Sequence, residues 1–173
     1  MHGIALAIYD YGVIITGESG IGKSDLGLKL IERGHKFIAD DHIQLSLIDD
    51  NLNIQAHDKL GGFIYIRDIG FIDVKTTYGD NSQILQHKLN LIIELVKNHP
   101  DSDDKPNDDN NFYYTEILGQ QVLMIKLNIA NNRPLELLVE LTVKYRQQLN
   151  NGYNANQNFI DKQQQLLERN SCN

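Results

Sequence analysis

The 173-residue sequence has no tryptophan, only three prolines and a single cysteine, Cys172. One cysteine cannot form an internal disulfide, which favours a reducing, cytoplasmic setting. No apolar run approaches the roughly 20 residues that a membrane-spanning helix needs. The stretch MHGIALAIYDYG at the N-terminus also lacks a basic leader and a small-residue cleavage site. We therefore expect neither a signal peptide nor contact with a membrane.

Positive charge is also scarce. The chain has 16 Lys and Arg against 23 Asp and Glu, a net charge of −7 with His counted as neutral. This balance opposes general attraction to nucleic acid, so any bound phosphate must be held by local geometry. The length and the 41% hydrophobic content suit one domain over residues 1–173.

The apolar pattern and the turn residues predict both strands and helices. We expect strands at Ile4–Ile8, Gly12–Thr16, Lys36–Asp40, Gln44–Ile48 and Gln121–Ile129, and a strand pair, Phe63–Arg67 and Phe71–Val74, around Gly70. We expect helices from about Lys23 to Arg33, from Pro134 to Gly152 and at Phe159–Arg169, so that residues 134–173 are helical.

Two segments are harder to interpret. Lys88–Val96 fits a strand by its alternating leucines and isoleucines, and also fits a helical stripe. His99–Asn111, with the sequence HPDSDDKPNDDNN, has almost no apolar content. We interpret it as a mobile, solvated loop in preference to a binding segment.

The clearest motif follows the second predicted strand. The stretch GESGIGKS matches the phosphate-loop pattern G-x-x-x-x-G-K-[ST], with an apolar strand before it and an amphipathic helix after it. Glycines let phosphate oxygens approach the backbone, and the N–H groups at the helix start attract an anion. The predicted nucleotide-binding residues are Gly17, Glu18, Ser19, Gly20, Ile21, Gly22, Lys23 and Ser24. We expect an exposed Lys23 ammonium that reaches the phosphates, and a Ser24 hydroxyl that binds Mg²⁺.

Two aspartates, Asp40 and Asp41, end the strand that follows this helix. If that strand is parallel to the Gly12–Thr16 strand and adjacent to it, both carboxylates lie beside the phosphate loop. There they could bind Mg²⁺ and accept a hydroxyl proton. The alternative is a surface turn or a helix cap, where aspartate is also common.

These residues resemble a known family. The stretch GESGIGKSDLGLKLIERGHKFIADD, Gly17–Asp41, is similar to the catalytic domain of HPr kinase/phosphorylase. Further similarity lies in His2-Gly3, in GGFIYIRDIGFIDV (Gly61–Val74), in NNRPLELLVE (Asn131–Glu140) and in NGYNANQNF (Asn151–Phe159). The family has long forms with an N-terminal domain and short forms without one, and this chain resembles a short form.

The resemblance implies an α/β fold: a P-loop-containing domain of the HPr kinase/phosphoenolpyruvate carboxykinase type, with a mixed sheet and flanking helices. It implies an ATP- and Mg²⁺-dependent kinase that phosphorylates a serine of HPr, a phosphocarrier of the sugar phosphotransferase system. It also implies phosphorolysis of the seryl phosphate, the use of pyrophosphate and phosphate, and a hexamer.

Site residues follow from the same resemblance, position by position. Asp41 becomes the proton acceptor of phosphorylation and the proton donor of the reverse reaction, and Ser24 a Mg²⁺ ligand, with Asp40 beside it. The remaining active-site positions are His2, Lys23, Arg67 and, in the Asn128–Arg133 loop tied to dephosphorylation, Arg133.

The sequence also departs from the family pattern. Tyr65 aligns with a glutamate that binds Mg²⁺, Asp68 with a glycine, and Ile117 with an arginine. A missing carboxylate weakens the metal site unless Asp68 or Asp40 replaces it. A missing arginine removes a charge that would stabilise the transferring phosphoryl group.

Three functions are consistent with these observations. The first is an HPr kinase, with or without phosphorylase activity. The second is a nucleotide-binding regulator of the same fold with weak or no catalysis, favoured by Tyr65 and Ile117. The third is a small-molecule kinase related to the phosphoenolpyruvate carboxykinase type.

Overall fold

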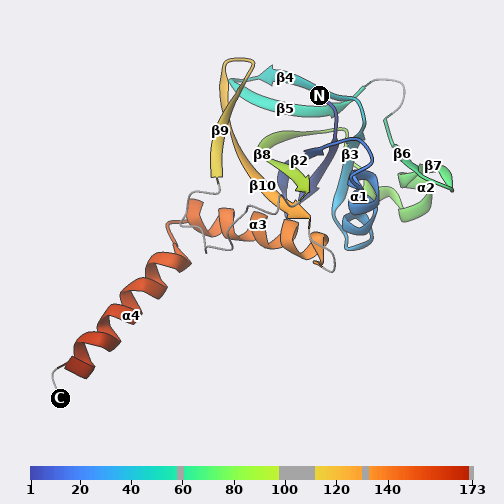
Figure 1. Ribbon diagram of the computed structural model, residues 1–173. Helices are drawn as coiled ribbons and strands as arrows, with labels where there is room; N and C mark the ends of the chain where they lie inside the picture. The colour runs from blue at the N-terminus through green and yellow to red at the C-terminus, as the bar shows by residue number, and fades with distance from the viewer. Residues whose placement is uncertain (58–60, 98–111, 130–132, 172–173) are drawn as a thin grey trace.

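Figure 1 shows the computed structural model, which describes residues 1–57, 61–97, 112–129 and 133–171. The predicted mobile loop at 99–111 and the lone cysteine lie outside the described residues. No helix in the described part of the chain is both long enough and apolar enough to cross a membrane.

The core of the structure is a mixed sheet in which six strands follow the order β3-β1-β2-β8-β10-β9. These strands are β1 (Ile4–Ile8), β2 (Tyr11–Gly17), β3 (Lys36–Asp40), β8 (Gln86–Lys97), β9 (Phe112–Ile117) and β10 (Gln120–Ile129). The β2–β8 and β8–β10 pairs are parallel, and the other pairs along this path are antiparallel. The expected mixed sheet with flanking helices is therefore confirmed.

The condition set for Asp40 and Asp41, that β3 runs parallel to β2 and next to it, is met in direction but not in adjacency. β1 lies between the two strands and is antiparallel to both. Two antiparallel steps restore the direction, so β2 and β3 still run the same way. Their C-terminal ends, at Gly17 and Asp40, consequently lie at the same edge of the sheet.

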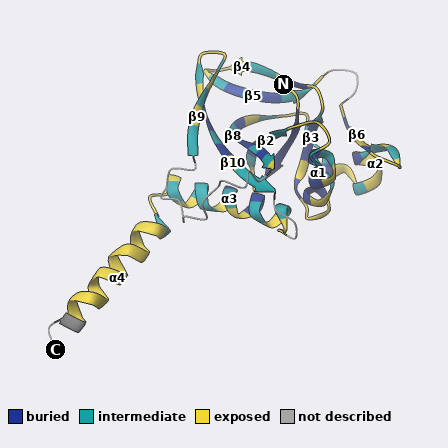
Figure 2. Cartoon of the chain, viewed as in Figure 1, coloured by how far each residue is buried: buried dark blue, intermediate teal, exposed yellow. Residues whose placement is uncertain are grey.

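Each face of the sheet buries one hydrophobic cluster. One face packs under α1 (Lys23–Glu32) and α3 (Leu135–Asn150), through side chains that include Leu30 and Val139. The other face packs under the hairpin of β4 (Ile43–Ile48) and β5 (Asn51–Ala56), whose strand β5 also pairs with β8. Figure 2 shows the buried residues gathered between these layers.

Short elements and the last helix complete the chain. The hairpin of β6 (Phe63–Ile66) and β7 (Gly70–Asp73) leads into α2 (Val74–Tyr78) and a 3₁₀ turn at Asp80–Ser82. The final helix, α4 (Ala155–Ser171), projects away from the sheet and is almost entirely exposed where its side chains are described (Figure 2). The predicted helices and the predicted strand pair around Gly70 are confirmed, whereas α2, β5 and β9 were not expected.

A charge cluster around the buried Glu140 connects the C-terminal end of α1 to α3. Arg33 donates from Nε to Glu140 Oε1 at 2.8 Å, and His35 Nε2 lies 2.8 Å from the same oxygen. The side chains of Glu140 and His35 are each only 5% exposed. The hydrogen bond from Arg33, followed by that from His35, lowers the pKa of Glu140 to about 2, although burial opposes this shift. The cluster thus fixes the phosphate-loop helix against α3.

Candidate phosphoryl-transfer site

The predicted phosphate loop joins β2 to α1, so the strand–loop–helix context that the motif requires is present. Gly17 ends the strand with a φ of 142°, and a Cβ there would lie 2.7 Å from the Leu95 carbonyl oxygen. Gly22 immediately precedes the helix with a φ of 95°, in the left-handed region that favours glycine. Both glycines are therefore needed to bring the loop over the ends of β2 and β8.

Lys23 is the first residue of α1, and its side chain is buried, contrary to the expectation that it would be exposed. Its Nζ donates to the carbonyl oxygens of Gly17 and Glu18, each at 3.0 Å. The side chain thus folds back across the loop, which explains its burial. The ammonium group is held at the centre of the loop, where a bound phosphate would meet it.

Ser24 and Asp40 form an oxygen pair at the start of α1. The Ser24 hydroxyl donates to Asp40 Oδ2 at 3.1 Å. Burial raises the pKa of Asp40, while the hydrogen bonds from Ser24 and from the Tyr65 backbone N–H act in the opposite direction. Mg²⁺ prefers one or two protein oxygens completed by phosphate oxygens and water. The hydroxyl and the half-buried carboxylate fit that ion, and they come from the residues that the sequence indicated.

No cluster of three or more His, Cys, Asp or Glu side chains suited to a metal occurs in the described residues. Tyr65, where the sequence resemblance leads us to expect a metal-binding glutamate, lies beside Asp40 through its backbone hydrogen bond. Its ring packs edge-on against Phe71, with centroids 5.3 Å apart. Asp68 is exposed in the β6–β7 turn with a φ of 69°.

Asp41 turns away from Asp40 because its backbone is left-handed, with a φ of 66°. Its carboxylate lies 2.9 Å from His2 Nδ1, and its side chain is 65% exposed. The Asp41 N–H donates to the Gly3 carbonyl at 2.8 Å, which holds the N-terminal residues against this turn. The two aspartates therefore have different surroundings: Asp40 faces Ser24, and Asp41 faces His2 and the solvent.

The two predicted arginines differ in their relation to this site. Arg67 lies in the β6–β7 turn, and one of its terminal nitrogens is 3.8 Å from where a Cβ on Gly20 would sit, so its guanidinium lies over the phosphate loop. Arg133 is exposed immediately before α3. Among the described residues no hydrogen bond or ion pair joins Arg133 to the loop, and residues 130–132 lie outside the description.

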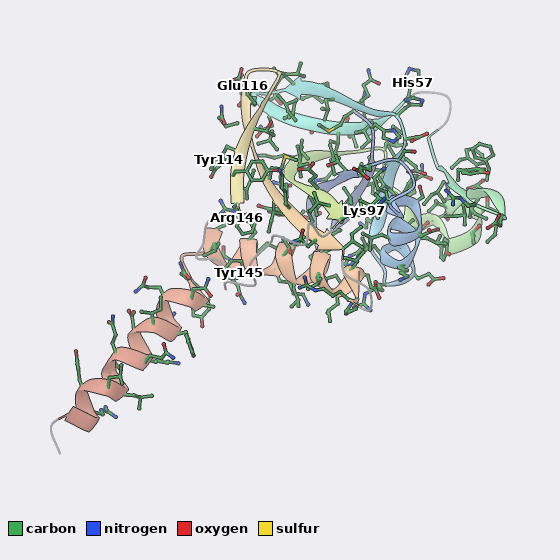
Figure 3. All side chains as sticks on the ribbon, in the orientation of Figure 1. His57, Lys97, Tyr114, Glu116, Tyr145 and Arg146 are labelled. Carbon is green, nitrogen blue, oxygen red and sulfur yellow. The ribbon has the colours of Figure 1, made fainter. Side chains whose placement is uncertain are left out.

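Two features of this region were not found from the sequence. Lys97, labelled in Figure 3 at the end of β8, forms an ion pair with Glu18 of the loop, with Nζ 3.6 Å from the carboxylate. An open pocket of about 980 Å³ lies beside Asp40 and Asp41, and Phe63, Tyr65 and Phe71 form part of its wall. These aromatics lie in the strand pair that the sequence predicted, but the surface that they share depends on the fold.

The sequence of this chain is similar to a known protein family over most of its length. The chain matches the family model described as HPr Serine kinase C-terminal domain over residues 1–163. Relatives named HPr kinase/phosphorylase include those of Cupriavidus metallidurans and Alkaliphilus metalliredigens, each 35% identical, over 170 and 173 residues. The matches cover 97% and 99% of this chain but 52% and 55% of the relatives, so the chain spans about half their length.

The fold of this chain is also similar to that of a solved structure. The Hpr(Ser) kinase/phosphatase from Coxiella burnetii aligns with a TM-score of 0.81 at 37% identity. The alignment covers 92% of this chain and 96% of that chain. The similarity thus extends from the phosphate loop to nearly all of the fold.

Proposed function

The chain belongs to the HPr serine kinase family, and on that premise we propose that it transfers the γ-phosphoryl group of ATP to a serine of HPr. One observation carries the proposal. The loop lysine, the Ser24–Asp40 oxygen pair and the exposed carboxylate of Asp41 follow the C-terminal ends of β2 and β3 at one edge of the sheet, which supports phosphoryl transfer to a hydroxyl.

In this proposal the chain's own residues position the donor. The loop N–H groups and the Lys23 ammonium bind the β- and γ-phosphates, and Arg67 adds positive charge above the loop. Ser24 and Asp40 would hold Mg²⁺, which neutralises phosphate charge when it is bound. These groups fix the γ-phosphorus for in-line attack from the side of Asp41.

Asp41 is the proposed general base. Its exposed carboxylate takes the serine proton as the serine oxygen bonds to the γ-phosphorus and the bond to the β-phosphate oxygen breaks, giving ADP. His2, 2.9 Å away, orients this carboxylate. In phosphorolysis a phosphate oxygen attacks the seryl phosphorus, pyrophosphate forms, and Asp41 returns the proton to the serine oxygen.

The setting of this activity follows from the family resemblance. We propose that the protein acts in the cytoplasm, as a regulator of the sugar phosphotransferase system, and that it assembles into a hexamer. We propose that pyrophosphate serves as a second donor and that Arg133, within the Asn128–Arg133 loop, acts in the dephosphorylation step.

A second candidate function is a nucleotide-binding regulator with weak or no catalysis. The observation that favours it is Tyr65, whose ring contacts Phe71 at the position of the family's metal-binding glutamate. Ile117, at the end of β9, likewise provides no charge.

One experiment separates the two. The protein is incubated with γ-labelled ATP, Mg²⁺ and HPr, and the label is followed by gel and by mass spectrometry of the serine peptide. Label on HPr supports the kinase. ATP binding by calorimetry without label on HPr supports the regulator and contradicts the kinase.

A further inference from the structure

The pocket beside Asp40 and Asp41 has an unusual wall for a site that handles phosphate. Its volume is about 980 Å³, near the upper end of ligand pockets. The lining is mostly apolar and includes Met1, Ile43, Ala56, Phe63, Tyr65 and Phe71; besides the two aspartates, its polar members include His42, Gln44 and His57. Such a wall suits apolar side chains better than a phosphorylated or charged small molecule.

The aromatic part of the wall comes from the β6–β7 hairpin. Its strands alternate, so Ile64 and Ile66 are buried, whereas Phe63 and Tyr65 are 44% and 53% exposed. Phe71 stands opposite Tyr65 in the antiparallel register and is 76% exposed. Adjacent exposed aromatics of this kind are typical of surfaces that bind another protein.

The position of Asp41 indicates what enters the pocket. Asp40 faces Ser24 and the phosphate loop, whereas the Asp41 carboxylate is exposed and lies at the pocket. In-line transfer places the acceptor opposite the donor phosphates. A serine hydroxyl that reaches Asp41 therefore brings the neighbouring residues of its own chain into the pocket.

We propose that Phe63, Tyr65 and Phe71 form an acceptor pocket that binds an apolar side chain next to the acceptor serine. The inference rests on the proposed kinase function and adds to it a determinant of specificity. Phe71 and Phe63 are more exposed than core residues, so replacing them leaves the core intact.

The test is the kinetics of HPr phosphorylation by Phe63→Ala and Phe71→Ala. Full burial of an exposed phenylalanine side chain is worth about 1.5–3 kcal/mol, and only the exposed 44% of Phe63 and 76% of Phe71 is left to bury, so each KM for HPr should rise by about threefold to fortyfold. The KM for ATP should stay unchanged. Tyr114→Ala is the matched control, because Tyr114 is 61% exposed but lies on the edge strand β9, on the other side of the molecule from the β6–β7 hairpin (Figures 1 and 3).

Acceptor variants complete the test. Apolar residues within about four positions of the HPr serine are changed singly to alanine and combined with Phe71→Ala. If Phe71 contacts the HPr side chain that was replaced, the two substitutions change the KM for HPr non-additively, by about twofold or more, which corresponds to about 0.5 kcal/mol. Fully additive effects with every acceptor variant would overturn the proposal.

The outcomes also separate this proposal from the function on which it rests. If the unaltered chain does not phosphorylate HPr, the proposed function fails. If it does, and Phe63→Ala and Phe71→Ala leave the KM for HPr unchanged, or raise the KM for ATP equally, only the acceptor pocket fails.

Discussion

Replacing Glu140 by glutamine should destabilise the fold in a manner that depends on pH. The carboxylate receives hydrogen bonds from Arg33 and His35, and its side chain is only 5% exposed. These partners lower the pKa of Glu140 from 4.5 to about 2. The difference corresponds to about 3 kcal/mol of stability, because one pKa unit is worth about 1.4 kcal/mol.

The direction of the pH dependence follows from the lowered pKa. Above pH 4.5 the carboxylate is charged in both the folded and the unfolded chain, and its contribution is fully present. As the pH falls below 4.5 the unfolded chain binds the proton first, so stability decreases, and about half of the contribution is lost by about pH 3. Glutamine has no charge to lose, so the difference between the two proteins should shrink over the same range.

Urea unfolding followed by circular dichroism, from pH 7 down to pH 3, measures this difference. We expect Glu140→Gln to lose up to about 3 kcal/mol at pH 7. The control is Glu136→Gln, one turn earlier on α3, whose partner Lys29 is 60% exposed and lies 3.5 Å away. Such a pair should contribute less than about 1 kcal/mol. A loss below about 0.5 kcal/mol for Glu140→Gln, or one that is constant with pH, would refute the reasoning.

Three further predictions concern the proposed site and assembly. Lys23→Ala should abolish ATP binding in calorimetry while circular dichroism shows a folded chain; unchanged ATP affinity would contradict the role of the loop. Tyr65→Glu should tighten Mg²⁺ binding in the presence of ATP, because it adds a carboxylate beside Asp40; unchanged metal affinity would mean that position 65 does not face the metal. The chain should sediment as an oligomer at micromolar concentration, whereas a single 19.7 kDa species would contradict the proposed assembly.

The sequence was sufficient where structure is set by local residues. The phosphate loop is a local motif, so the glycines and Lys23 predicted β2, the loop and α1 in their correct order. The end of α1 was predicted from Gly34, which follows it with a φ of 91°. These features need no knowledge of distant partners.

Long-range pairing is where the sequence was insufficient. Lys88–Val96 was ambiguous because β8 lies between β2 and β10 and buries Leu91 and Ile93 on one face of the sheet and Ile92 on the other. Apolar residues on both faces fit a helical stripe as well as the alternation of a strand. The place of β1 between β2 and β3 is a matter of topology, which no local pattern contains.

In the candidate site too, the sequence indicated residues, whereas the contacts between them depend on the fold. His2 and Asp41 were both indicated, but only the fold brings them to 2.9 Å through the left-handed turn at Asp41. Lys23 was expected to be exposed, and its burial depends on the carbonyls of Gly17 and Glu18 that face it. The acceptor pocket needs β3, β5 and the β6–β7 hairpin together, so periodicity alone could not reveal it.

Asp41→Asn tests the central claim most directly. The rates of HPr phosphorylation by ATP and of phosphorolysis of seryl-phosphorylated HPr are measured for the unaltered chain and for Asp41→Asn. ATP affinity checks that the variant is folded. Asp40→Asn is the control for a change at the proposed metal site. Asparagine keeps the shape but cannot accept a proton, so both rates should fall by about a hundredfold or more, with ATP affinity unchanged. Asp40→Asn should alter the Mg²⁺ dependence more than proton transfer. If Asp41→Asn keeps near-normal rates in both directions, Asp41 is not the base, and the proposed mechanism is wrong.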